Sequence, residues 1–238
     1  MKNIYKNSEI YKLEYKNIEL PLYLHQVIIG LLLSDGSLEK SSPTSETRLS
    51  VSFGLINSPY LFHLYNLLEP YCNSPPNFFS VYNKKTNSNN TIIKFKTVSL
   101  PLFSYYHKMF YKYDSNLNKY VKILPSNIKN LISPVALAHL IMGDGNFKKK
   151  DKIIRIYTNS FKENEVKKLA KILTNKLNII TRAVHDRNDQ YILVISKNQI
   201  DIVISLIEKH IHKSMLYKLG ISNVAKFGFN YCDVIEKI

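Results

Sequence analysis

The chain has 238 residues, and its 33 lysines and arginines outnumber its 18 aspartates and glutamates, which gives a formal net charge of +15 at pH 7. An excess of this size indicates a polyanionic partner, because neutralising phosphates releases counterions and dominates nucleic-acid affinity. Cys72 and Cys232 lack the spacing of a zinc site or of a disulfide framework. The longest apolar runs, such as Val27 to Leu33, are far shorter than the roughly 20 residues that cross a bilayer. We therefore expect a nucleic-acid-binding protein that does not associate with membranes.

The first half of the chain alternates helix and strand signals after a charged N-terminal extension at residues 1–20, which shows no secretory signal. The strict alternation of polar and apolar residues in Arg48–Phe53 indicates a half-buried strand. We assign residues 21–112 to this half-domain and residues 113–133 to a linker. The predicted elements are a helix at Leu22–Ser34, a strand at Arg48–Phe53, a helix at Tyr60–Leu68, strands at Phe79–Tyr82 and Thr91–Thr97, and a helix at Leu100–Tyr111.

The second half-domain, residues 134–238, repeats this order of elements. Each half is predicted to form an αββαββα unit, in which a four-stranded antiparallel sheet carries helices on one face and charged side chains on the other. The fold class is therefore α+β, with two pseudo-symmetric halves joined at two apolar helices. After the second apolar helix, the predicted elements are a strand at Ile153–Thr158, a helix at Lys162–Leu177, strands at Ile180–His185 and Tyr191–Ser196, and a helix at Gln199–Lys209.

One segment of nine residues occurs twice. Ile28–Gly36 reads IIGLLLSDG and Leu137–Gly145 reads LAHLIMGDG, with the two aspartates 109 residues apart. Both copies predict a buried helix that ends at a glycine suited to the left-handed C-terminal position. The small residues Gly30, Ser34 and Gly143 favour close packing of the two helices. His139, at the position of Gly30, is interpreted as a core histidine.

The repeat places an acid, Asp35 or Asp144, at the C-terminus of each helix, where the helix dipole disfavours negative charge. If the helices pack side by side, the two carboxylates also repel each other. A divalent cation such as Mg²⁺ relieves both problems, because it takes one or two carboxylates together with water and phosphate oxygens as ligands. The pattern therefore indicates metal-assisted phosphate chemistry.

The two motifs resemble those of the LAGLIDADG homing endonucleases in their single-chain form, and the resemblance extends from about Pro21 onward. It implies a double-strand break in a long, asymmetric DNA target, made across the minor groove and leaving 3′ overhangs, with Asp35 and Asp144 as the catalytic acids. It also implies Mg²⁺ as cofactor, with Mn²⁺ able to substitute and Ca²⁺ supporting binding without cleavage. The expected metal-site residues are Asp35, Asp144, Ser34 and Gly143.

Two lysines follow the two units at similar positions. Lys122 lies in Tyr-Val-Lys-Ile-Leu-Pro and Lys218 in Leu-Tyr-Lys-Leu-Gly, 96 residues apart. The resemblance implies that such a lysine lies near each acid and helps to position or activate the attacking water. A Lys-x-Leu match by itself is weak, because most lysines are simply solvated.

The charged faces of the two sheets are the predicted DNA-binding surface, since such sheets enter a major groove and read base edges with polar side chains. An ordinary solvated sheet face is the alternative for any single residue, and the interspersed tyrosines could instead stack on unpaired RNA bases. The candidate DNA-binding residues are Arg48, Ser50, Ser52, Lys84, Lys94 and Lys96 in the first half and Arg155, Tyr157, Asn159, Arg182 and Arg187 in the second.

Two other functions remain open from the sequence. The resemblance also covers RNA maturases that assist splicing of their host intron, and a DNA-binding regulator on the same fold needs basic faces but no metal. The presence of both acids and both lysines favours the nuclease. The expected partners are double-stranded DNA and, for the alternative, host intron RNA; a monomer is expected because both halves lie in one chain. The resemblance and the composition indicate a mitochondrial or other organellar, intron-encoded protein.

Overall fold

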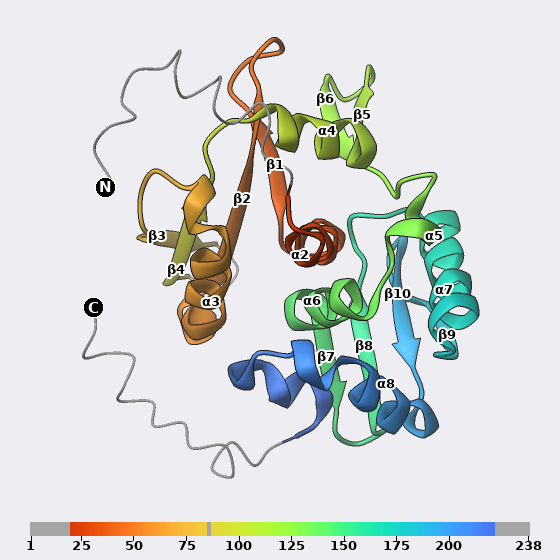
Figure 1. The fold of residues 1–238 in the computed structure, drawn as a ribbon. Coiled ribbons are helices and arrows are strands. Elements are labelled where there is room, and N and C mark those ends of the chain that lie inside the picture. Colours follow the sequence, from red (N-terminus) through yellow and green to blue (C-terminus); the bar gives the residue numbers. More distant parts are fainter. Residues whose placement is uncertain (1–19, 85–86, 222–238) are drawn as a thin grey trace.

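Two helices occupy the centre of the computed structural model, which describes residues 20–84 and 87–221. The N-terminal extension predicted at residues 1–20 therefore lies almost wholly outside the described residues. These helices, α2 (Leu22–Leu33) and α6 (Pro134–Asp144), lie side by side between the two halves (Figure 1). Every residue from Val27 to Leu33 and from Val135 to Gly143 is buried. These two stretches are thus enclosed on all sides, which explains why they are almost entirely apolar.

The two halves contain one four-stranded antiparallel sheet each, as predicted, with strand orders β1-β2-β4-β3 and β7-β8-β10-β9. The sequence pattern located only three strands in each half. The missing strands, β1 and β7, follow the motif acids directly and have only four residues, too few to show an alternation. The strands are β1 (Ser37–Lys40), β2 (Thr47–Gly54), β3 (Asn77–Asn83), β4 (Ser88–Lys96), β7 (Gly145–Lys148), β8 (Ile153–Tyr157), β9 (Thr181–Arg187) and β10 (Gln190–Ile195).

Amphipathic helices cover the core face of each sheet. Helices α3 and α4 pack on β2, and α7 packs on β9 and β10. Within the two described ranges, no helix has the length and apolar character needed to cross a membrane. The helices on the sheets are α3 (Ser58–Leu68), α4 (Pro101–Phe110) and α7 (Glu163–Leu177), and α8 (Ile200–Ile207) packs on α6.

The segment interpreted as a linker contains secondary structure of its own. Strands β5 (Tyr111–Asp114) and β6 (Lys119–Lys122) form a hairpin, and the short helix α5 (Ile128–Leu131) follows. Asn118 adopts a positive φ of 47° in the hairpin turn, a conformation that asparagine tolerates better than most residues. The hairpin matters for the site because Lys122 is the last residue of β6.

The glycines of the two Asp-Gly pairs are needed for a different reason from the predicted one. Gly145 has φ −74°, and Gly220 is the only glycine with positive φ in the described residues, so the expectation of a left-handed helix end was wrong. A Cβ on Gly36 would lie 2.8 Å from the carbonyl oxygen of Leu31, and one on Gly145 would lie 2.9 Å from Ile141 Cγ2. The chain passes too close to the last helical turn for any side chain.

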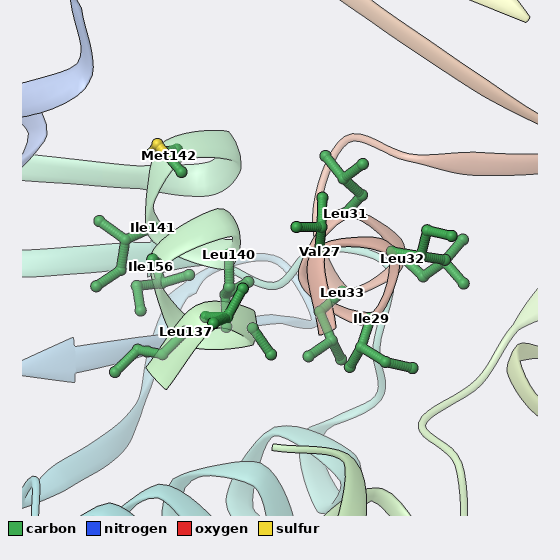
Figure 2. Close-up of a cluster of buried hydrophobic side chains, with 14 of the residues drawn as sticks. Val27, Ile29, Leu31, Leu32, Leu33, Leu137, Leu140, Ile141, Met142 and Ile156 are labelled. Atoms are coloured by element: carbon green, nitrogen blue, oxygen red, sulfur yellow. The ribbon is translucent and has the colours of Figure 1, made fainter. Parts of the chain in front are cut away.

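Small residues set the distance between α2 and α6. A Cβ on Gly30 would lie 2.6 Å from both the carbonyl oxygen of Ala136 and Cβ of His139, and one on Gly143 would lie 2.6 Å from Cβ of Ser34. The backbones of α2 and α6 therefore pack directly against each other at Gly30 and Gly143, as predicted. Figure 2 shows how the larger side chains, including Ile29 and Leu140, fill the space around this crossing.

We expect Gly30→Ala to lower the free energy of unfolding by about 2 kcal/mol, because overpacking against a backbone oxygen outweighs the gain in helix propensity of about 1 kcal/mol. Urea denaturation measures the difference. Gly54→Ala is the matched control, since a Cβ there meets nothing within 4 Å. Equal stabilities of the two variants would contradict the close helix crossing.

Candidate active site

The two motif acids lie at the same end of the helix pair. Asp144 is the last residue of α6, and Asp35 follows α2 by two residues. The Asp35 carboxylate lies beside the opposite helix, since a Cβ on Gly143 would be 3.1 Å from its Oδ2. Asp144 is half-buried. Asp35 is exposed to solvent, but the surrounding protein atoms displace part of its hydration shell. The helix crossing thus brings together two acids that are 109 residues apart in the sequence.

Each candidate lysine binds the backbone next to the acid of its own half. Lys122 Nζ donates hydrogen bonds to the carbonyl oxygens of Ser34 at 3.1 Å and Gly36 at 2.9 Å. Lys218 is buried, with 7% of its surface exposed, and its Nζ donates to the carbonyl oxygen of Gly143. The structure therefore gathers the four residues predicted to be catalytic, and the two lysines occupy equivalent places in the two halves.

Burial and mutual repulsion change the acidity of this cluster. Burial, followed by the charge of Asp35, raises the pKa of Asp144 to about 7, although both lysines act in the opposite direction. Burial also raises the pKa of Asp35. Burial lowers the pKa of Lys122 to about 8 and lowers that of Lys218, against the attraction of both acids. Two partly desolvated carboxylates close together are unfavourable in their charged form, and an added cation would stabilise that form.

The donor set at this site suits a hard divalent cation. Residues 20–84 and 87–221 contain no group of three or more histidine, cysteine, aspartate or glutamate side chains placed to hold a metal. The available donors are the carboxylates of Asp35 and Asp144 and the carbonyl oxygens of Ser34 and Gly143, and each of these carbonyls already faces an ammonium group. Mg²⁺ suits so few protein ligands, because it keeps several waters and takes substrate phosphate oxygens.

The candidate DNA-binding residues of the first half share one face of the sheet. In the register of the sheet, Ser50 lies opposite Lys96 and Ser52 lies opposite Lys94, whereas Leu49 and Val51 point into the core. Ser50 is only 2% exposed, so it offers little surface to a ligand in this conformation. Arg48 belongs to the same face, and Lys84 lies exposed in the turn after β3.

The candidates of the second half are more dispersed. Arg155 and Tyr157 project from the same face of β8, and Arg182 lies across β10 from Arg155. Asn159 and Arg187 are exposed in the turn after β8 and at the end of β9. The Nε atom of Arg155 is buried and has no hydrogen-bond partner in the described part of the chain, so a ligand that reaches it gains a donor.

Sequence reasoning missed Glu39, whose side chain reaches from the edge strand β1 to cations of β2 and β4 on the first-half face. Its carboxylate forms ion pairs with Arg48, Lys94 and Lys96. Nothing in the local pattern indicated this role, because Glu39 lies in a short strand that was not located and its partners lie up to 57 residues away in the sequence.

His139 is a core residue, as interpreted from the sequence. It is fully buried, and its Nδ1 lies 2.7 Å from the hydroxyl of Tyr60. Burial lowers the pKa of His139 to about 3, so the ring is neutral at physiological pH. It fills the helix crossing opposite Gly30.

We expect Asp144→Asn to be more stable than the wild type above pH 7 by about 1–3 kcal/mol and equally stable near pH 4. The folded-state pKa of Asp144, about 7, exceeds its unfolded value, so the folded state binds more protons in this interval and the stability of the wild type falls as pH rises. Urea denaturation in EDTA from pH 4 to pH 8 measures the effect. Asp189→Asn, in an exposed turn, is the control; a difference that does not vary with pH would contradict the assignment.

Comparison with known proteins gives consistent matches. Residues 25–203 match the sequence profile of the LAGLIDADG DNA endonuclease family. The DNA endonuclease I-ChuI of Chlamydomonas applanata is 33% identical over 65% of this chain and 73% of its own length. The cytochrome b mRNA maturase bI2 of Saccharomyces cerevisiae is 30% identical over 84% of this chain, which spans about half (48%) of that maturase. A solved structure of the homing endonuclease I-WcaI bound to its DNA recognition sequence has a TM-score of 0.79 at 23% identity, covering 91% of this chain and 95% of that one, so the two share a fold.

Proposed function

The chain belongs to the LAGLIDADG DNA endonuclease family, and we propose that it is a site-specific homing endonuclease that makes a metal-dependent double-strand break in DNA. The observation that carries the proposal is the duplicated constellation of one acid and one lysine per half, gathered at one end of the helix pair. Two equivalent centres beside each other suit the hydrolysis of two strands of one duplex.

The proposed mechanism assigns a role to each residue of the cluster. Asp35 and Asp144 would hold Mg²⁺ together with the carbonyl oxygens of Ser34 and Gly143, and each acid would serve principally one strand. When bound there, the metal would supply a nucleophilic water and would stabilise charge on the phosphate and on the leaving 3′ oxygen. Lys122 and Lys218 stabilise the negative charge that develops on the phosphate and lower the pKa of a nearby water.

The two sheets form the proposed DNA-binding surface. A net charge of +15 supports binding to the phosphate backbone, while the polar residues of the two faces supply base-specific contacts. The faces differ in most of their residues, which favours a long and asymmetric target. In line with the family resemblance, we propose cleavage across the minor groove with 3′ overhangs, by a monomer.

Intron RNA maturation is the second candidate. The similarity to a cytochrome b mRNA maturase over 84% of this chain favours it, and a single protein could carry both activities on different surfaces. An intron-encoded protein of this kind would act in a mitochondrion or another organelle, which is the location that we propose.

We expect Asp35→Asn and Asp144→Asn each to lower the rate of double-strand cleavage at least 100-fold, because each removes a metal-binding carboxylate. DNA affinity should stay within about threefold, since neither acid lies on the sheet faces. Gel assays of plasmid linearisation and of DNA retention measure the two quantities. Linear product at the wild-type rate from Asp144→Asn would refute the assignment, and a splicing defect caused by the same change would favour the maturase.

The function itself can be tested with a plasmid library of partly random inserts, incubated with the protein in Mg²⁺ or in Ca²⁺. We expect linear product in Mg²⁺ and none in Ca²⁺, with related insert sequences in the linear fraction, which would also give the target. Retention of DNA or host-intron RNA without any linear product would instead favour a binding or maturase role.

A further inference from the structure

One carboxylate organises three cations on the first-half sheet face. Glu39 in β1 lies 3.2 Å from Arg48 in β2 and 3.2 and 2.8 Å from Lys94 and Lys96 in β4. All four side chains are partly exposed. Partial burial acts to raise the pKa of Glu39, but hydrogen bonds from Lys96 and Lys94 outweigh it and lower the pKa to about 2, so the carboxylate stays charged at any working pH.

The second half lacks this arrangement at every equivalent position. Glu39 and Lys148 are equivalent, since each follows the aspartate of its motif by four residues. In the strand register, Glu39 lies opposite Arg48, whereas Lys148 lies opposite Ile153. Val194 and Ile192 replace Lys96 and Lys94 in the same register. Lys148 forms its ion pair with Asp151 in the adjoining turn instead. The first half therefore has a glutamate, Glu39, next to three cations. At the equivalent positions, the second half has a lysine next to three apolar residues.

We propose that Glu39 is a positioning residue that determines the sequence specificity of the first half-site, an inference that rests on the proposed DNA-binding function. Unrestrained lysines and arginines contact phosphates, which carry no sequence information. Held by Glu39, Arg48, Lys94 and Lys96 keep defined positions on the face before DNA binds, which lowers the entropic cost of presenting their donors to guanine O6 and N7 in the major groove. The negative charge of Glu39 also keeps phosphates away from this part of the face.

The test is a binding selection from a randomised duplex library in Ca²⁺, which needs no cleavage, performed with the wild type, Glu39→Gln and Glu39→Asp. The control is Glu163→Gln, which changes the net charge equally and breaks a single ion pair, with Lys167, on α7. A Lys94→Ala selection marks the base positions that belong to the first half-site. Thermal melting verifies that each variant is folded.

We expect Glu39→Gln to lose about tenfold in base discrimination at the positions marked by Lys94→Ala, and none in the other half-site. Because Glu39→Gln removes one negative charge that repels phosphates, affinity for non-specific DNA should rise, and its dependence on the logarithm of salt concentration should steepen by about one. Glu39→Asp keeps the charge but shortens the reach, so it should lose discrimination without the change in salt dependence. Glu163→Gln should leave the first half-site profile unchanged.

Two results would overturn the inference. Unchanged profiles for both Glu39 variants would show that the cations need no positioning, and an equal loss in both half-sites would show a general charge effect. A wild type that selects no DNA sequence would refute the proposed function itself, whereas selection without cleavage in Mg²⁺ would refute only the nuclease activity and leave the role of Glu39 measurable.

Discussion

The close crossing of α2 and α6 is the constraint on which the rest of the structure depends. The helices approach until backbone atoms are in contact, and only the absence of side chains at Gly30 and Gly143 permits this. The same approach joins the two halves into one core and brings the two acids to one end of the helix pair. Stability and site geometry therefore share one set of contacts, and a change that separates the helices affects both.

The site is held in an electrostatically unfavourable state by this packing. Two carboxylates and two ammonium groups share a partly desolvated region, where burial disfavours the charged form of each. Lysines bound to the backbone carbonyls of Ser34, Gly36 and Gly143 offset part of the repulsion. The fold thus retains a local arrangement that is unfavourable for stability, a feature typical of functional sites and consistent with the metal and phosphate binding that we propose.

Sequence reasoning succeeded where the information was repeated and failed where it was not local. The duplicated motif located the helix pair and both acids, whereas the two lysines were assigned from the family resemblance, supported by a spacing similar to that of the acids. Strands β1 and β7 were missed because four residues show no period, and the hairpin before Lys122 because its strands are as short. The ion pairs of Glu39 join residues 9 to 57 positions apart, which no local pattern reveals.

Side chains of α7 hold the connection between the halves in place: Lys168 and Lys176 donate hydrogen bonds to backbone carbonyls of residues 126–130, and Glu165 binds the segment nearest the site. Glu165, at the start of α7, accepts hydrogen bonds from the backbone N–H of Leu124 at 2.7 Å and of Lys162 at 2.8 Å. Leu124 follows Lys122 by two residues, so a second-half carboxylate fixes the segment that carries the first-half lysine. The halves are consequently not interchangeable modules. A chimaera built by grafting one half onto a relative would have to carry Glu165 together with the segment that holds Lys122, because the carboxylate binds the backbone of that segment.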